Sequence, residues 1–207
     1  MNKLLLLCLF ISLIFYNQDF EGKIEYKTSY KVLSDKESET SLKNDLGTKM
    51  TFIVKNGFTK EISNAAYGNL HIFNPIENRI YFTDSFSPNI LFYTNGKKAE
   101  PNKNVKYKVV KNAEIILGHK CDKLIYTAEN YEIVYFYSPD LKYDPKYAKN
   151  FTYTNKNKKV AIMKSIFLKQ VMTTKNFIAT VEAVKITPQK ISDKEFDKPK
   201  HKVLKEE

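Results

Sequence analysis

Alternating apolar and polar residues identify the first segment after the N-terminal leader as a β-strand. Its polar face carries lysine, glutamate and serine at alternate positions from Lys23 to Lys31. Its apolar face carries Ile24, Tyr26, Thr28, Tyr30 and Val32. Successive side chains of a strand point to opposite faces of the sheet, so this period of two predicts an antiparallel strand that is buried on one face only.

Turn signals between the later apolar runs predict a series of hairpins. Asn56-Gly57 can adopt the positive φ angles of a type I′ turn between two alternating segments. Further turns are expected at residues 74–78, at Asn95-Gly96 and at Glu129-Asn130. Residues 131–138 are apolar on both faces, which predicts a strand covered on both sides. Residues 161–174 and 176–187 are expected to form the final strand pair.

Residues 34–47 form the first of two predicted covering segments. Ser34 and Glu37 have the spacing of a capping box, and Gly47 can end a helix. The segment is therefore either a short surface helix or a mobile loop.

Residues 139–151 form the second predicted covering segment. Asp144-Pro145 suits an N-cap followed by the first helical position, which predicts one helical turn through Tyr147 and Ala148. Residues 152–159 are polar, and we interpret them as a connection.

The C-terminal region is predicted to contain a docked turn followed by a loose tail. Ser192 and Glu195 repeat the capping-box spacing, and Phe196 is placed to pack that turn on the core. The charged residues 197–207 are expected to fray.

These elements predict a mainly β fold: a curved antiparallel half-barrel of about nine strands with one or two short covering helices. The single domain is expected to span residues 19–196. The concave side of such a sheet can be filled by its own side chains or can hold an apolar ligand. The candidate ligand-binding residues are Phe82, Phe92, Tyr135, Tyr137 and His119, and for the four aromatic residues core packing is the alternative role.

Residues 1–18 have the pattern of a signal peptide. A positive start, "MNK", precedes an apolar run from Leu4 to Tyr16, which is shorter than the roughly 20 residues of a membrane-spanning helix. Cleavage is expected near Asn17-Gln18, and an uncleaved anchor is the alternative. This pattern predicts a periplasmic or secreted protein of a Gram-negative cell envelope with no transmembrane segment after cleavage. Removal of Cys8 would leave Cys121 alone, without an intramolecular disulfide.

The formal net charge of +11 comes almost wholly from lysine, because Arg79 is the only arginine. Proteins that recognise nucleic acids favour arginine for bidentate contacts, so we predict no nucleic-acid partner. The lysines are scattered along the chain. They form either an ordinary solvated surface or a basic surface that meets anionic lipid or polysaccharide.

His119 and Cys121 form the one candidate pair for catalysis. In a strand they share a face with their Cβ atoms roughly 6–7 Å apart, too far for a thiol–imidazole hydrogen bond without a bend at Gly118. We therefore interpret Cys121 as a buried strand residue and predict no enzyme activity. The histidines, His71, His119 and His201, are dispersed, and no Gly-rich phosphate loop occurs, so neither a metal site nor a cofactor is predicted.

Two short patches carry a resemblance to known families. "EIILGHKCDKL", residues 114–124, resembles the I-L-G-aromatic-K-C-K-K signature of uncharacterised secreted bacterial domains that include the GLPGLI proteins. Residues 165–196 are similar to the ending that those domains share with the LolA/LppX-like lipoprotein carriers. The GLPGLI string itself is absent and His119 replaces the usual aromatic residue, so a sister family is expected. The resemblance implies a half-barrel whose open side is covered by helices.

The leader, the curved sheet and the resemblance together predict an exported, non-enzymatic envelope protein. Its ligand would be apolar or amphipathic, such as a lipid or an acylated protein or peptide. Residues 34–47 and 139–151 would act as its lid. The alternative is a structural or interaction protein of the envelope with a filled core and a lysine-rich binding surface, and an enzyme that uses Cys121 is a third hypothesis.

Overall fold

The computed structural model describes residues 18–98, 104–200 and 203–207. Its strands form one twelve-stranded sheet in the order β12-β6-β5-β4-β3-β2-β1-β11-β10-β9-β8-β7. Residues 1–17 of the expected leader, which include Cys8, and His201 lie outside the described residues. The strands are β1 (Gly22–Val32), β2 (Lys49–Lys55), β3 (Phe58–Ser63), β4 (Leu70–Asn74), β5 (Arg79–Thr83), β6 (Ile90–Asn95), β7 (Lys106–Ile116), β8 (His119–Thr127), β9 (Tyr131–Lys142), β10 (Ser165–Thr174), β11 (Phe177–Pro188) and β12 (Val203–Glu206).

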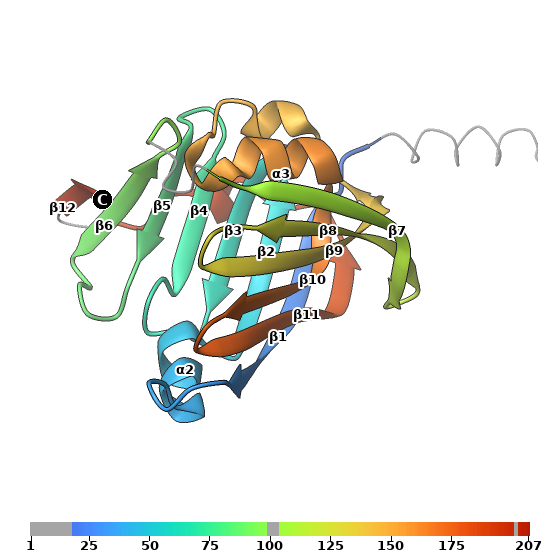
Figure 1. Cartoon of the computed structure of the whole chain (residues 1–207). Helices are drawn as coiled ribbons and strands as arrows, with labels where there is room; N and C mark the ends of the chain where they lie inside the picture. Colours follow the sequence, from blue (N-terminus) through green and yellow to red (C-terminus); the bar gives the residue numbers. More distant parts are fainter. Residues whose placement is uncertain (1–17, 99–103, 201–202) are drawn as a thin grey trace, which may run out of the picture.

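The open, strongly curved sheet confirms the mainly β prediction (Figure 1). One half contains β12 and β6 to β1, the other contains β11 to β7, and the halves meet where β1 pairs with β11. A register shift between Glu25 and Tyr26 interrupts this central pair, and such bulges bend a strand and increase its twist. The predicted number of about nine strands was too low: the sheet has twelve, and the strand that was not predicted at all, β12, comes from the C-terminal tail.

Both predicted type I′ positions of the first hairpin have the expected backbone. Asn56 has a φ of 48° and Gly57 a φ of 83°, and β2 and β3 pair on either side of them. A second two-residue turn, Leu117-Gly118, joins β7 to β8 with φ angles of 50° and 84°. The "LG" of the family-like patch is therefore a hairpin turn.

The predicted covering segment at residues 34–47 contains helix α2 (Glu39–Leu46). Its N-cap is Ser38, whose hydroxyl accepts a hydrogen bond from the Ser41 N–H at 3.0 Å, and not Ser34. Gly47 ends the helix as expected, with a φ of 78° and its N–H donated to the Lys43 carbonyl.

The segment after β9 differs more from its prediction. The turn η1 (Pro145–Ala148) is capped by Asp144 as predicted, and a second turn, η2 (Tyr153–Asn155), follows. The polar connection expected at residues 152–159 is wrong, because Lys156–Met163 form helix α3. Val160 packs on the main core cluster, while Ile162 and Met163 pack on a second cluster, so tertiary contacts outweigh the polar start of the helix. Residues 161–163 accordingly do not begin β10.

Two core clusters lie between the sheet and its covering segments. The main cluster joins both halves of the sheet and includes Ile24, Tyr26, Phe52, Cys121 and Leu168. The second is rich in tyrosine and belongs to β8 and β9, with Leu124, Tyr126, Ile133, Tyr135 and Tyr137.

A third cluster packs the C-terminal turn η3 (Asp193–Phe196) against the first half of the sheet. Phe196 contacts the cluster of Ile72, Tyr81 and Leu91, and its ring centroid lies 5.6 Å from that of Phe58. The predicted docking of Phe196 is confirmed.

The fraying predicted for the tail is wrong for residues 203–207. Val203–Glu206 pairs in parallel with β6, the edge strand of the first half. Val203 donates its N–H to the Asn89 carbonyl, and Glu207 donates to the Tyr93 carbonyl at 3.0 Å. The side chains of β12 are exposed, so backbone hydrogen bonds of the kind that an unpaired sheet edge offers hold the segment. The Tyr93 hydroxyl adds a hydrogen bond to Glu206 Oε2 at 3.0 Å.

Candidate functional site

A row of cross-strand neighbours on the concave face forms the floor of the site. The register pairs Phe52 of β2 with Glu61, Glu61 with His71, His71 with Phe82, and Phe82 with Phe92 of β6. Paired residues share a face, so one charged side chain, Glu61, lies within an otherwise aromatic row. The rings of His71 and Phe82 are stacked at 5.8 Å, and those of Phe82 and Phe92 at 5.3 Å.

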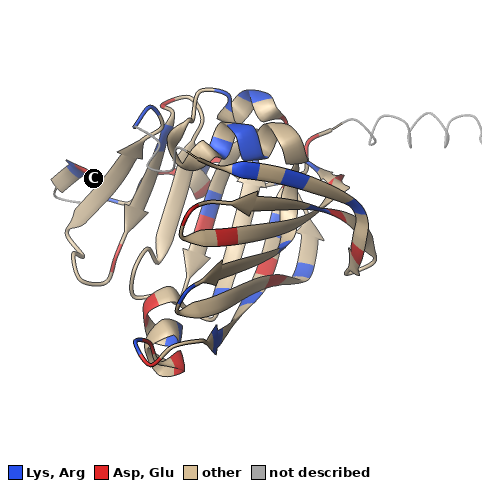
Figure 2. Cartoon of the chain, viewed as in Figure 1, with Lys and Arg blue, Asp and Glu red and all other residues tan. Residues whose placement is uncertain are grey.

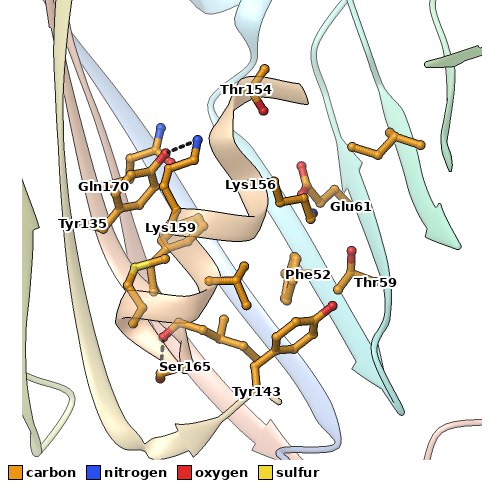
Figure 3. A pocket seen from close by; sticks show the side chains of 15 residues that line it. Phe52, Thr59, Glu61, Tyr135, Tyr143, Thr154, Lys156, Lys159, Ser165 and Gln170 are labelled. Carbon is orange, nitrogen blue, oxygen red and sulfur yellow. Dashed lines mark hydrogen bonds between the residues drawn. The ribbon is translucent and has the colours of Figure 1, made fainter. Parts of the chain in front are cut away.

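Helix α3 lies over this face and forms one wall of a partly open cavity of about 230 Å³ (Figure 3). The helix contributes Lys156, Lys159, Val160 and Met163, and the cavity also touches β2, β3, β5, β9 and β10. The apolar and aromatic part of the lining consists of Phe52, Ile80, Tyr135, Tyr143, Val160, Met163, Ile166 and Phe167. Glu61, Lys156, Lys159 and Gln170 add polar groups, so the cavity has a mixed lining.

A second cavity of about 250 Å³ continues along the concave face toward α2. It shares Glu61 and Gln170 with the first cavity, so the two cavities adjoin. Its walls include Leu46 at the end of α2, His71, and apolar side chains of β1, β10 and β11. The concave face therefore carries an extended hollow between α3 and α2.

Lys156 is the most unusual group of the hollow. Its Nζ lies 4.3 Å from the ring centroid of Phe73 and 5.7 Å from that of Phe151, and these rings are 2% and 0% exposed. Within the described ranges, the Lys156 ammonium forms no ion pair or hydrogen bond. Desolvation lowers the pKa of Lys156, and the nearby carboxylate of Glu61 opposes that shift without cancelling it.

Lys159 lies one turn further along α3. Its Nζ is 3.4 Å from the Tyr135 hydroxyl and 5.2 Å from the ring centroid of Tyr126. Burial raises the pKa of Tyr135 well above its usual range, with the Tyr131 hydroxyl and the Glu61 carboxylate among smaller contributions, so this hydroxyl remains protonated near neutral pH. Lysines three residues apart on a helix share a face, which is why both line one cavity.

The structure places the five predicted binding residues in different environments, and only one of them lines either cavity. Tyr135 lines the first cavity. Phe82 and Phe92 lie on the same concave row but line neither cavity, and Tyr137 is a buried member of the second core cluster, 4% exposed. His119 lies at the start of β8, where its Nδ1 is 2.9 Å from Asp140 Oδ2, and it also lines neither cavity.

Cys121 has the environment expected of a packed strand residue. It is 0% exposed, and its thiol donates to the His119 backbone carbonyl at 3.5 Å and not to the imidazole. Desolvation raises the pKa of the thiol to about 11, so the nucleophilic thiolate is scarce near neutral pH. In the described part of the chain, no group of three or more His, Cys, Asp or Glu side chains is arranged to hold a metal ion.

Sequence reasoning missed Glu61, Lys156 and Lys159. Glu61 shares a face of β3 with the polar residues Thr59 and Ser63, so only its register beside Phe52 and His71 places it in the hollow. The lysines belong to the segment interpreted as a polar connection. Their spacing of three residues, followed by "VAIM", is the one signal that could have indicated a helix with its lysines turned inward.

The architecture is similar to part of a solved protein called PNGF-II. In a C2 crystal form the TM-score is 0.50 at 15% identity, over 89% of this chain and 31% of PNGF-II, and a P21 form gives 0.49 over 90% and 31%. This chain thus spans about a third of PNGF-II, and the likeness concerns the fold alone. A domain described as an outer membrane lipoprotein-sorting protein, from Vibrio parahaemolyticus, has a TM-score of 0.38 at 10% identity over 91% of this chain and 95% of its own length, too low to support an inference.

No protein-family model and no curated protein matches the chain. The resemblance to the GLPGLI-type families and to the LolA/LppX-like carriers therefore stays a prediction. Among the helices in the described ranges, none combines the length and the apolar character needed to cross a bilayer.

Proposed function

We propose that the chain is an exported, non-enzymatic envelope protein that binds an amphipathic ligand, such as a lipid or an acylated peptide, in its concave face. The observation that carries this proposal is the pair of adjoining cavities between α3 and α2. Their walls are largely apolar, and each cavity also has a few polar groups, with Glu61 and Gln170 shared between them. That combination is typical of small-molecule binding sites. The assignment to the envelope rests on the leader predicted from residues 1–18.

The size of the hollow favours an extended apolar segment over a bulky ring system. The first cavity, about 230 Å³, exceeds the roughly 150 Å³ engineered cavity that accepts benzene but is below the usual 300 Å³ for a drug-sized ligand. A single acyl chain matches this shape, since it can pass from the first cavity along Gln170 into the second.

Helix α3 replaces residues 139–151 as the principal cover in this proposal. Pro139 to Lys142 belong to β9, whereas α3 contributes four residues to the cavity wall. Helix α2 covers the other end, consistent with the earlier hypothesis for residues 34–47. Opening of α3 would expose the first cavity without breaking a strand pair.

Lipid extraction of natively purified protein tests the proposal. The wild-type chain, produced with its leader and purified without detergent, should release a near-stoichiometric lipid or acylated species in mass spectrometry. Val160→Trp should fill the first cavity and abolish that release. Ala161→Trp provides the matched control, because the neighbouring Ala161 is exposed and lies outside the cavity. Wild-type protein without bound lipid and without affinity for amphipathic probes would contradict the proposal.

One observation favours the alternative function as an interaction protein. A surface groove of about 270 Å³ between η1 and α3 is lined by Lys146, Lys149 and Lys158 together with Pro145 and Ala161. Lysines are also distributed over the strands (Figure 2). Retention on vesicles containing anionic lipid, weakening steeply with salt and lost in a Lys149→Gln/Lys158→Gln variant, would support this function. Equal retention on neutral vesicles would count against it.

A further inference from the structure

We propose that the ligand carries an anionic head group, a carboxylate or a phosphate, and that the ammonium of Lys156 binds it inside the first cavity. This inference rests on the proposed function and makes it more specific, because it names the chemistry of the head and the end of the hollow where the head lies.

The first argument is the unsatisfied state of the Lys156 ammonium. It lies beside the buried rings of Phe73 and Phe151 and forms no ion pair or hydrogen bond within the described ranges. Cation–π contacts compensate for only part of the hydration free energy that an ammonium loses when it is partly removed from water. An ammonium that lines a cavity beside two buried rings is therefore best satisfied by an anionic oxygen supplied from outside the chain.

The charge balance of the cavity also favours an anionic ligand. Lys156 and Lys159 both line it, against the single carboxylate of Glu61, so the lining carries an excess of one positive charge when all three groups are ionised. In Figure 3 Lys156 extends from α3 toward Glu61, and Lys159 extends toward Tyr135. Lys159 contacts the Tyr135 hydroxyl at 3.4 Å, so these two groups add hydrogen-bond donors to another part of the same cavity wall.

The lysines of α3 set the orientation of the ligand. Lys156 and Lys159 both line the first cavity, and the nearby Glu61 carboxylate offsets only part of their positive charge. The head is therefore expected at the α3 end. The apolar tail is expected to follow Phe52 and Phe167 and to continue past Gln170 toward α2. The opposite orientation would place the anion in the second cavity, away from both lysines of α3.

A comparison of three probes of equal chain length tests the head-group chemistry on the wild-type protein. Dodecanoate, dodecanol and dodecylammonium are titrated below their aggregation thresholds by isothermal calorimetry, with dodecyl phosphate as a fourth arm. Dodecanoate or dodecyl phosphate should bind about tenfold or more tightly than dodecanol, since a buried charge-assisted hydrogen bond is expected to contribute on that scale. The stronger of the two anions indicates which head group fits.

Removal of the ammonium tests the residue. Lys156→Met should abolish the preference for dodecanoate over dodecanol while dodecanol binding persists. Lys158→Met is the control, because Lys158 is an exposed lysine of the same helix that does not line the cavity, and it should leave the preference unchanged.

The outcomes separate the two proposals. If dodecanol binds as tightly as the anions, or if dodecylammonium binds most tightly, the hollow binds amphiphiles but the role of Lys156 is refuted. A preference that survives in Lys156→Met refutes it as well. If none of the probes binds, the proposed function itself fails. The wild-type comparison remains decisive even where a variant does not fold.

Discussion

Asp122 of β8 is a buried carboxylate, and the effect of its hydrogen bonds on its pKa outweighs the effect of desolvation. Its Oδ2 accepts from Lys111 Nζ at 2.7 Å and its Oδ1 from the Asn112 N–H at 3.0 Å, while the Asp122 side chain is only 12% exposed. Burial alone would raise the pKa of this carboxyl. The hydrogen bonds from Lys111 and Asn112 hold that pKa below its usual value.

Asp122→Asn should therefore lower the free energy of unfolding at pH 7 by about 1–3 kcal/mol. A carboxyl with a depressed folded pKa stabilises the fold above its unfolded pKa of about 4, and that stabilisation disappears as the pH falls through the folded value. The difference between wild type and variant should shrink as the pH falls below about 4, because the Asp122 carboxylate then becomes protonated in the folded state as well. Urea unfolding at pH 7 and pH 2.5 measures both values, and an equal loss at the two pH values would contradict this account.

The thiol of Cys121 is expected to be inert in the folded protein. It has no exposed surface, and desolvation raises its pKa to about 11, so both access and thiolate formation are suppressed. Iodoacetamide at pH 8 should label Cys121 only after unfolding in urea, as located by peptide mass spectrometry. Labelling of the folded chain at the denatured rate would restore Cys121 as a candidate nucleophile.

At the scale of elements, two glycines in hairpin turns separate the effect of backbone conformation on stability from the effect of side-chain packing. Gly57 and Gly118 have nearly equal φ angles of 83° and 84°. A Cβ added at Gly57 would lie 2.2 Å from Cγ of the Tyr147 ring, whereas one at Gly118 would meet nothing within 4 Å. The Tyr143 hydroxyl also donates to the Gly57 carbonyl at 2.7 Å, so the β2–β3 turn is fixed against the segment around η1.

Gly118→Ala should therefore lower the free energy of unfolding by about 1 kcal/mol, because an alanine is less stable than a glycine in the left-handed backbone conformation. Gly57→Ala should cost clearly more, about 2–4 kcal/mol, because η1 must also move. Chemical denaturation of both variants provides the comparison. Equal losses would show that the contact between the turn and Tyr147 contributes nothing.

The elements also show where local sequence was sufficient and where it was not. The hairpin of β2 and β3 follows from alternation and Asn56-Gly57, which are local signals. Helix α3 begins at Lys156 without a side-chain N-cap hydrogen bond, and its packing comes from Val160, Ile162 and Met163 against partners far away in the chain. The pattern of residues around α3 in the sequence contains none of those partners, so it could not predict how the helix packs.

At the scale of the whole molecule, occupancy of the hollow should control stability. A ligand that binds only the folded state raises the free energy of unfolding by about 2.7 kcal/mol at a hundredfold excess over its Kd. Under the proposed function, the melting temperature should rise progressively with dodecanoate concentration. The rise should be absent in Val160→Trp and present in Ala161→Trp. A concentration-independent melting temperature in the wild type would contradict occupancy of the cavity.

The sequence by itself determined the strand periods and the hairpin turns at Asn56-Gly57 and Glu129-Asn130, because each depends on neighbours within a few residues. It also predicted that Cys121 is packed in a strand and placed Tyr135 among the candidates for the concave face, although the partners of both come from distant parts of the chain. Only the tertiary structure decided that α3 covers the sheet, that β12 joins β6, and that Glu61, Lys156 and Lys159 meet in one cavity. Those three side chains come from β3 and α3, about a hundred residues apart, so cross-strand register and helix docking, which no local pattern encodes, bring them together.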